Sequence, residues 1–247
     1  MIGVMALIQC SAVRVIVALL VFPGESSARV PMGLVMQPGP SRPEIAGLLQ
    51  QAEAGDAEAQ YQVGSRFAGG QGVTHDDGEA LKWWLKAAAQ GHPLSQWAVG
   101  IFYREGRGGL AKSAEEAVAW FRKAANQGNA WGQAELALMY ETGEGVPQDN
   151  AEAVRLYTRA ADQGLPIAIF DLAYMYENGK GVSADSEKAV KLYELSAISI
   201  PTARRNLAIL YSEGQGTVRK DPIVAYKWGC SQSRRNFNGF FTKQPPI

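Results

Sequence analysis

Catalysis in proteins usually depends on histidine, on cysteine or serine nucleophiles, or on paired carboxylates, and this chain offers few such groups. Its 247 residues include two histidines, His75 and His92, and two cysteines, Cys10 and Cys230. The periodic pattern described below places no serine or cysteine nucleophile beside either histidine. No Ser-x-x-Lys sequence occurs, which excludes the serine β-lactamase type of nucleophile. We therefore expect no catalytic residues.

The acidic residues with regular spacing have a structural interpretation. Asp76, Asp149, Asp185 and Asp221 recur along the chain, each at the start of a predicted helix. A carboxylate at that position accepts hydrogen bonds from the free N–H groups of the first turn, so we interpret these aspartates as helix N-caps. No Cys-x-x-Cys pair or Cys/His cluster exists, which argues against a structural zinc site. The sequence predicts no metal and no cofactor.

Composition and charge narrow the class of partner. Hydrophobic residues make up 47% and charged residues 19% of the chain, which is typical of a globular protein. Lys+Arg and Asp+Glu both number 24, so the net charge gives no basic surface for nucleic acid. Basic residues exceed acidic ones from residue 215 onward. Both a solvated tail and a basic contact patch are compatible with that excess.

The N-terminal region is predicted to direct export. Residues 1–22 are nearly all apolar, and residues 15–22 have the length of a signal-peptide core, too short to span a bilayer. The small residues Ser26, Ser27 and Ala28 fit a signal-peptidase cleavage site. Residues 1–28 are therefore predicted to be a signal peptide, which implies a periplasmic or secreted protein. The alternative is that residues 1–22 stay as a membrane anchor, which would be the chain's only membrane contact. Residues 29–42 are rich in proline and glycine and are predicted to form a flexible leader.

The rest of the chain is periodic, and its elements must position any functional side chains. A small residue within a short apolar segment recurs at steps of 36, 37, 36 and 35, at Gly64, Gly100, Ala137, Ala173 and Ala208. A Gly-x-Gly sequence follows each of these segments, and a second apolar segment follows each turn. Apolar residues at i, i+3, i+4 and i+7 predict helices, and paired glycines permit a positive φ after the first helix. One such hairpin cannot bury its own apolar faces, so neighbouring hairpins must stack.

The repeated pattern resembles that of the Sel1-like repeat, a relative of the tetratricopeptide repeat. It reads Ala-x-Ala-Gln-x-x-Val-Gly-x-x-Phe-x-x-Gly-x-Gly-Val, then Ala-x-x-Trp-x-x-x-Ala-Ala-x-x-Gly, between Ala57 and Gly91. The resemblance implies an all-α, right-handed α/α solenoid of about five helix-turn-helix repeats over residues 43–235, with terminal capping helices. The expected repeats lie near residues 57–92, 93–129, 130–165, 166–200 and 201–236, and residues 237–247 form a C-terminal tail. Residues 45–54 resemble a lone second helix that caps the first repeat.

The resemblance also indicates where a partner would bind. In related repeat proteins one face of each first helix lines a concave groove. In this chain the middle repeats carry apolar, aromatic and acidic residues on that face, and we take these as candidate partner-binding residues: Leu94, Trp97, Ile101, Trp131, Leu138, Glu141, Phe170, Tyr174 and Glu177. Aromatic side chains with a polar rim are typical of protein interfaces. The competing interpretation is that these residues pack between successive first helices, and it applies most to Ile101 and Leu138.

The function expected from the sequence is capture of another protein or peptide in that concave groove, without catalysis. The family suggests an immunity protein that neutralises a toxic secreted effector in the periplasm, or a scaffold for envelope or exopolysaccharide assembly. An enzyme acting on cell-wall or antibiotic substrates is the alternative from a different class. It would require a polar, convergent pocket, whereas the predicted groove is dominated by aromatic and aliphatic side chains.

Overall fold

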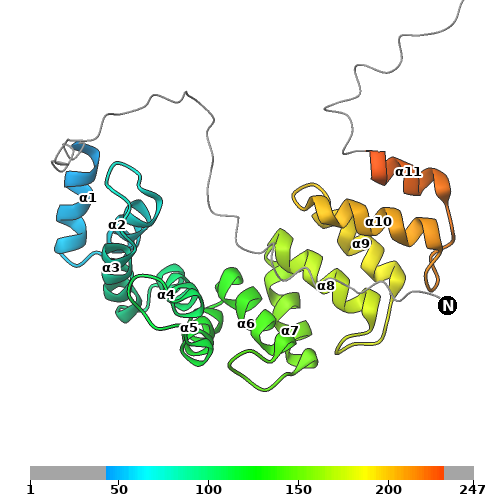
Figure 1. The fold of residues 1–247 in the computed structure, drawn as a ribbon, viewed down its shortest axis with the longest axis horizontal. Helices are drawn as coiled ribbons and strands as arrows, with labels where there is room; N and C mark the ends of the chain where they lie inside the picture. Colours follow the sequence, from blue (N-terminus) through cyan, green and yellow to red (C-terminus); the bar gives the residue numbers. More distant parts are fainter. Residues whose placement is uncertain (1–42, 231–247) are drawn as a thin grey trace, which may run out of the picture.

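The computed structural model describes residues 43–230, and in that range it contains eleven α-helices and no β-strand (Figure 1). The helices are α1 (Pro43–Glu53), α2 (Ala57–Gly69), α3 (Asp77–Ala89), α4 (Pro93–Glu105), α5 (Ala114–Asn126), α6 (Ala130–Thr142), α7 (Asn150–Asp162), α8 (Pro166–Asn178), α9 (Ser186–Ser196), α10 (Pro201–Glu213) and α11 (Pro222–Cys230). None of these described helices combines the length and apolar character needed to cross a membrane. The predicted signal peptide (1–28), leader (29–42) and tail (237–247) lie outside the described residues.

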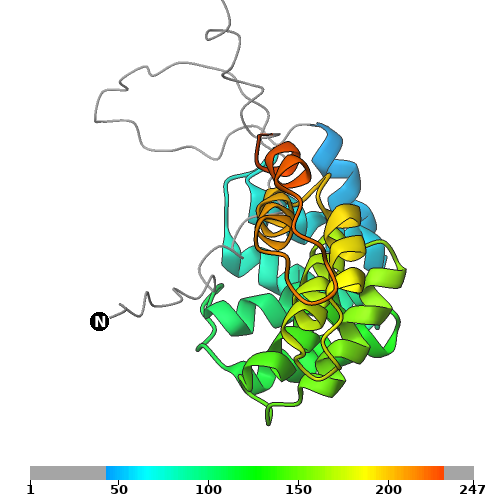
Figure 2. The same cartoon turned by 90° about the vertical axis from the view of Figure 1, so that its right-hand side faces the viewer.

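The helices form a single curved array of five hairpins. Each even-numbered helix from α2 to α10 packs against the helix that follows it, and each hairpin packs against the next. In Figure 1 the array forms an arc, and at α4 and α5 the first helix of the hairpin lies on its inner side and the second on its outer side. We call the even-numbered helices α2 to α10 the inner helices and the second helices of the hairpins, α3, α5, α7, α9 and α11, the outer helices. Figure 2 views the arc with the α9–α11 end toward the reader. The predicted all-α solenoid of five repeats is therefore confirmed, and α1 packs as a lone helix against α2 at its start.

Capping residues set the ends of the helices. The aspartates that the sequence identified accept backbone N–H hydrogen bonds at the starts of outer helices, as Asp76 does from Glu79 and Asp185 from Lys188. Each inner helix ends at a left-handed glycine with φ between 63° and 73°, at the first glycine of its Gly-x-Gly turn. The predicted N-caps and positive-φ turns are both confirmed.

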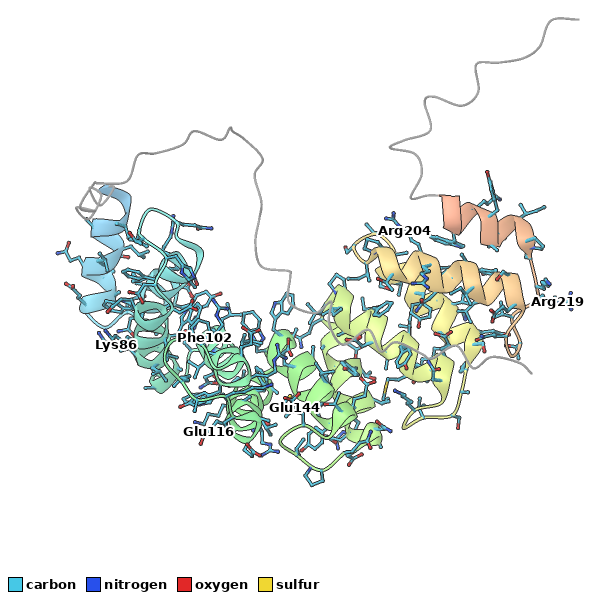
Figure 3. The ribbon with its side chains drawn as sticks, viewed as in Figure 1. Lys86, Phe102, Glu116, Glu144, Arg204 and Arg219 are labelled. Atoms are coloured by element: carbon cyan, nitrogen blue, oxygen red, sulfur yellow. The ribbon has the colours of Figure 1, made fainter. Side chains whose placement is uncertain are left out.

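Within each of the first two hairpins, a glycine of the inner helix permits close contact with an aromatic ring of the outer helix. A Cβ atom added to Gly64 would lie 2.6 Å from the Trp84 ring, and one added to Gly100 would lie 2.6 Å from the Phe121 ring. In the next two repeats alanine takes this position, and the large buried residues opposite are tyrosines, Tyr157 and Tyr193. Figure 3 shows how side chains such as the buried Phe102 fill the space between neighbouring helices.

From the second repeat onward, the second glycine of the turn lies against the preceding outer helix. A Cβ atom at Gly145 would lie 2.5 Å from the Ala114 carbonyl oxygen of the preceding outer helix, and one at Gly181 would lie 2.2 Å from the Asn150 carbonyl oxygen. Gly72, in the first repeat, has a similar positive φ but no atom within 4 Å of an added Cβ. Glycine at the position of Gly145 and Gly181 is therefore required for stacking as well as for the backbone conformation.

A glutamine relay also links the repeats. Gln60, Gln96 and Gln133 are buried on α2, α4 and α6, and each side-chain amide donates to a carbonyl oxygen of the preceding helix, which is α1, α3 or α5, at 3.0–3.4 Å. Each accepts in turn from a glutamine that ends its own outer helix, at 2.7–2.8 Å, and these donors are Gln90, Gln127 and Gln163. Because buried amides must be satisfied, the relay fixes the register of one hairpin on the next.

The relay changes in the last two repeats. Ile169 occupies the equivalent position on α8 and has no side-chain donor. Arg204, labelled in Figure 3 near the start of α10, replaces the glutamine there and donates its Nε–H to the Ala197 carbonyl oxygen at 2.7 Å. The junction between α7 and α8 is thus the one described junction at which this position offers no hydrogen-bond donor.

The two turn glycines give a matched test of stacking. Gly72→Ala and Gly145→Ala place a methyl group at a similar positive φ, which costs roughly 1–2 kcal/mol in each case. We expect Gly145→Ala to lower the free energy of unfolding by about 1–3 kcal/mol more, because its methyl group meets the Ala114 carbonyl. Urea denaturation followed by circular dichroism measures the difference. Equal losses in the two variants would contradict this account of the second glycine.

Candidate functional site

The predicted partner-binding residues lie on three consecutive inner helices. Leu94, Trp97 and Ile101 belong to α4, Trp131, Leu138 and Glu141 to α6, and Phe170, Tyr174 and Glu177 to α8. The fully buried residues of these helices lie at other positions, and the candidate residues are those that keep part of their surface exposed. Eight of the nine are partly exposed, and Tyr174 is exposed, with 37% of its surface accessible to solvent. We call this surface the inner face.

Two tryptophans from different repeats meet on the inner face. The ring centroids of Trp97 and Trp131 lie 5.6 Å apart, with the planes tilted by 37°. Both rings are only partly buried, and both pack on the core cluster that runs through α5 to α8. The pair therefore combines a fixed position with an exposed aromatic surface, which is the combination found in energetically important interface residues.

Phe170 is held differently. Its ring lies 5.5 Å from that of Tyr193, on the outer helix of the same repeat, and it packs on the C-terminal core cluster. Ile101 packs partly on the core cluster of the middle repeats, in agreement with the packing interpretation given above, although some of its surface stays exposed. The structure thus brings Trp97 and Trp131 together and directs Phe170 toward its own hairpin.

The two acidic candidates both have intramolecular partners, which the sequence pattern did not reveal. The Tyr157 hydroxyl donates to Glu141 Oε2 at 3.0 Å, and Lys180 Nζ lies 3.4 Å from Glu141 Oε1. Lys180 also lies over the Tyr174 ring, 4.7 Å from its centroid. The Tyr193 hydroxyl donates to Glu177 Oε2 at 2.6 Å. A tyrosine sixteen residues after each glutamate was the signal that could have identified these pairs.

Glu177 differs from Glu141 in its electrostatic surroundings. Burial raises the pKa of Glu177, the hydrogen bond from Tyr193 opposes that effect, and the negative charge of Glu213 adds to it. Burial together with the Glu177 carboxylate raises the pKa of the Tyr193 hydroxyl, which therefore remains a donor. Among residues 43–230 no cation forms an ion pair with Glu177, in contrast to the Lys180 contact of Glu141.

The other charged side chain of this region is paired as well. Arg104, on α4, forms an ion pair with Glu135 of α6, so it links two repeats. Together with the ion pair between Lys180 and Glu141, this gives two intramolecular ion pairs at the inner face. The surface left for a partner is mainly apolar and aromatic.

His92 lies in an arrangement that superficially suggests a catalytic triad and that sequence reasoning missed. Its Nδ1 atom lies 3.0 Å from Ser95 Oγ, and its Nε2 atom lies 3.1 Å from Glu58 Oε2. However, Nδ1 also accepts the Ser95 backbone N–H, so His92 is the N-cap of α4. Ser95 is fully buried, and a buried hydroxyl cannot attack a substrate. The His-Pro sequence at the helix start is the signal that indicated a cap.

Elsewhere in the described range the structure offers little for chemistry. Among residues 43–230 no group of three or more histidine, cysteine or acidic side chains could hold a metal ion. A hollow of about 570 Å³ lies between α10 and α11, lined in part by Arg205, Ile209 and Trp228. It contains none of the predicted residues.

The two glutamates predict opposite effects of neutral substitution. When the pKa of a carboxyl is raised in the folded state, the folded protein loses stability as the pH rises from the ordinary pKa of 4.5 through the raised pKa. Glu177→Gln should therefore raise the melting temperature at about pH 7 and leave it unchanged at about pH 4, where the carboxyl is largely protonated. Glu141→Gln should lower it slightly at about pH 7, because Lys180 loses its ion pair. Thermal unfolding at both pH values tests this, and a lower melting temperature for Glu177→Gln at neutral pH would contradict it.

Comparison with solved structures identifies similar repeat proteins. A protective antigen present in uropathogenic Escherichia coli strains, described as having an SLR fold, is 31% identical with a TM-score of 0.68, and the match covers 77% of this chain and 41% of that one. A Sel1 repeat protein from Oxalobacter formigenes is 34% identical with a TM-score of 0.67, covering 74% and 73% of the two chains. This chain thus spans about two fifths of the length of the first relative.

A more distant similarity concerns the fold alone. The crystal structure of an immunity protein from Pseudomonas aeruginosa is 18% identical with a TM-score of 0.52, and the match covers 81% of this chain and 77% of that one. The search of curated proteins finds no match.

The family comparison agrees with the repeat pattern. The model described as Sel1 repeat matches residues 57–92, 93–129, 132–165, 166–198 and 201–229. These five matches cover more than half of the chain and coincide with the five hairpins. The protein therefore belongs to the Sel1 repeat family, whose members generally serve as non-enzymatic scaffolds for protein interaction.

Proposed function

We propose that this protein binds an extended segment of another protein on its inner face, in the periplasm, and thereby acts as an immunity protein against a secreted effector. The observation that carries the proposal is the partly exposed aromatic pair Trp97–Trp131, fixed on two consecutive inner helices. Partly exposed Leu94, Ile101 and Leu138 extend the same apolar surface on these helices. Apolar surface of this kind on a folded protein usually marks a contact site.

The arrangement of charge supports binding over catalysis. Arg104 and Glu141 each have a partner within the molecule, so neither is available as a free acid, base or substrate clamp. The one serine–histidine contact described above is buried and serves as a helix cap. An immunity protein with the same fold supports the biological role only as a precedent, since its identity to this chain is 18%.

The periplasmic location rests on the first 28 residues. Their apolar run and the small residues up to Ala28 are those of an export signal, and an effector neutralised outside the cytoplasm would have to be met there.

Substitution of the tryptophans tests the binding surface. Trp97→Ala and Trp131→Ala should each weaken capture of the partner at least about tenfold, as is typical for a central interface tryptophan, while the far-ultraviolet circular dichroism spectrum stays helical. The matched control is Trp120→Ala, which removes a partly buried tryptophan from the outer helix α5. The measurement is a pull-down from periplasmic and secreted fractions, with quantitative mass spectrometry. Equal capture by all variants would argue against the inner face.

The export signal is tested separately. Expression of the full chain in a Gram-negative host should give a periplasmic protein whose N-terminal residue is Arg29, as measured by intact mass after osmotic shock. A protein that keeps Met1 and sediments with the membranes would favour the anchor alternative.

Turnover of a purified wall fragment by the protein would contradict the proposed non-catalytic role.

A further inference from the structure

The indole nitrogen of Trp97 is an anomaly. It is fully covered, yet within residues 43–230 it has no hydrogen-bond partner. The one other buried side-chain polar atom in the described range without a partner is an acceptor, Asn150 Oδ1. The nitrogen of Trp84, by contrast, donates to the Tyr61 carbonyl oxygen at 3.1 Å. Buried donors are nearly always paired in folded proteins, so an unpaired one calls for an explanation.

The position of Trp97 connects this donor with the inner face. Its ring lies against Trp131, which belongs to the next repeat. Along α4, Leu94 precedes it by three residues and Ile101 follows it by four, so all three lie on one side of the helix. These neighbours are partly exposed. The unpaired N–H therefore belongs to a residue of an apolar surface that is partly open to solvent.

The surrounding charges restrict which acceptor could reach it. The cation of the same helix, Arg104, is held by Glu135, and Lys180 is held by Glu141 and by the Tyr174 ring. A carboxylate brought to Trp97 would lose its hydration without gaining a free cation, which is unfavourable. A neutral carbonyl oxygen would lose much less hydration and would satisfy the donor.

We propose that Trp97 and Trp131 are the anchor for an extended, uncharged apolar segment of the partner, and that a backbone carbonyl oxygen of this segment accepts a hydrogen bond from Trp97 Nε1. A small displacement of the side chains that cover Nε1 accompanies binding. This inference rests on the proposed function and specifies its chemistry. Apolar side chains of the partner contact the two rings, and one of its carbonyl oxygens accepts the hydrogen bond from Nε1. The affinity therefore depends little on salt concentration.

The test separates the N–H group from the ring. A peptide is selected from a random library displayed on phage against the immobilised full chain, then synthesised, and its affinity is measured by calorimetry. Trp97→Phe keeps an aromatic ring and removes the donor, and it should weaken peptide binding about tenfold, the value of one hydrogen bond in a desolvated site. The matched control, Trp84→Phe, removes a donor that is already satisfied. It should keep the affinity and lower the melting temperature more than Trp97→Phe does.

A second readout is spectroscopic. In protein labelled with ¹⁵N-tryptophan, the Trp97 indole proton should shift downfield when the peptide binds, and the Trp84 signal should not move. Wild-type affinity in Trp97→Phe together with a loss in Trp131→Ala would overturn the hydrogen bond and leave the proposed function standing. Unchanged affinity in both Trp97→Ala and Trp131→Ala would overturn the proposed function itself. Selected peptides that are highly charged, with affinity that falls steeply with salt, would overturn the neutral acceptor.

Discussion

Close approach of consecutive hairpins is the constraint on which the rest of this structure depends. A hairpin of two amphipathic helices has apolar surface on both sides, and only stacking covers it. The turn glycines permit that approach, since a Cβ atom at Gly145 or Gly181 would overlap the backbone of the preceding outer helix. Gln60, Gln96 and Gln133 then fix the register by donating to carbonyl oxygens across the first three junctions. Non-directional burial and directional hydrogen bonds thus act on the same surfaces.

Because stacking uses one set of residues, the residues of the inner face can differ from repeat to repeat. The residues that recur in each repeat are used for the turn, the helix caps and the contacts between helices. Those that differ between repeats, such as Trp97, Trp131 and Tyr174, lie on the inner helices and keep part of their surface exposed. A surface that contributes less to folding can change for recognition at a lower cost in stability. The internal pairing of Arg104 and Glu141 further leaves that surface mainly apolar.

Much of the fold was predictable from the sequence because its signals are local. The spacing of small residues gave five hairpins, Asp76 and its equivalents gave the helix starts, and the glycine pairs gave the turns. The candidate residues lie on the first helices of three repeats, as the pattern predicts, and their role in binding stays a prediction. The pairings of side chains between repeats were not predictable, because their residues lie 34 to 39 positions apart and meet only after stacking. The contacts of Glu141 with Lys180 and of His92 with Glu58 are examples, and the unpaired Trp97 nitrogen follows from burial that no local pattern encodes.

The glutamine relay has a consequence for how an array of this kind can change its length. In the first three repeats each unit carries both halves of the relay, a buried glutamine on the inner helix and a second glutamine at the end of the outer helix. A unit duplicated or deleted within this part would find the same partners at its new borders. A unit copied from the fourth repeat would bring Ile169 to the junction and leave the opposing carbonyl without its donor. Hydrogen bonds would therefore fix the register at a new border within the first three repeats, and a border made by a copy of the fourth repeat would lack this one.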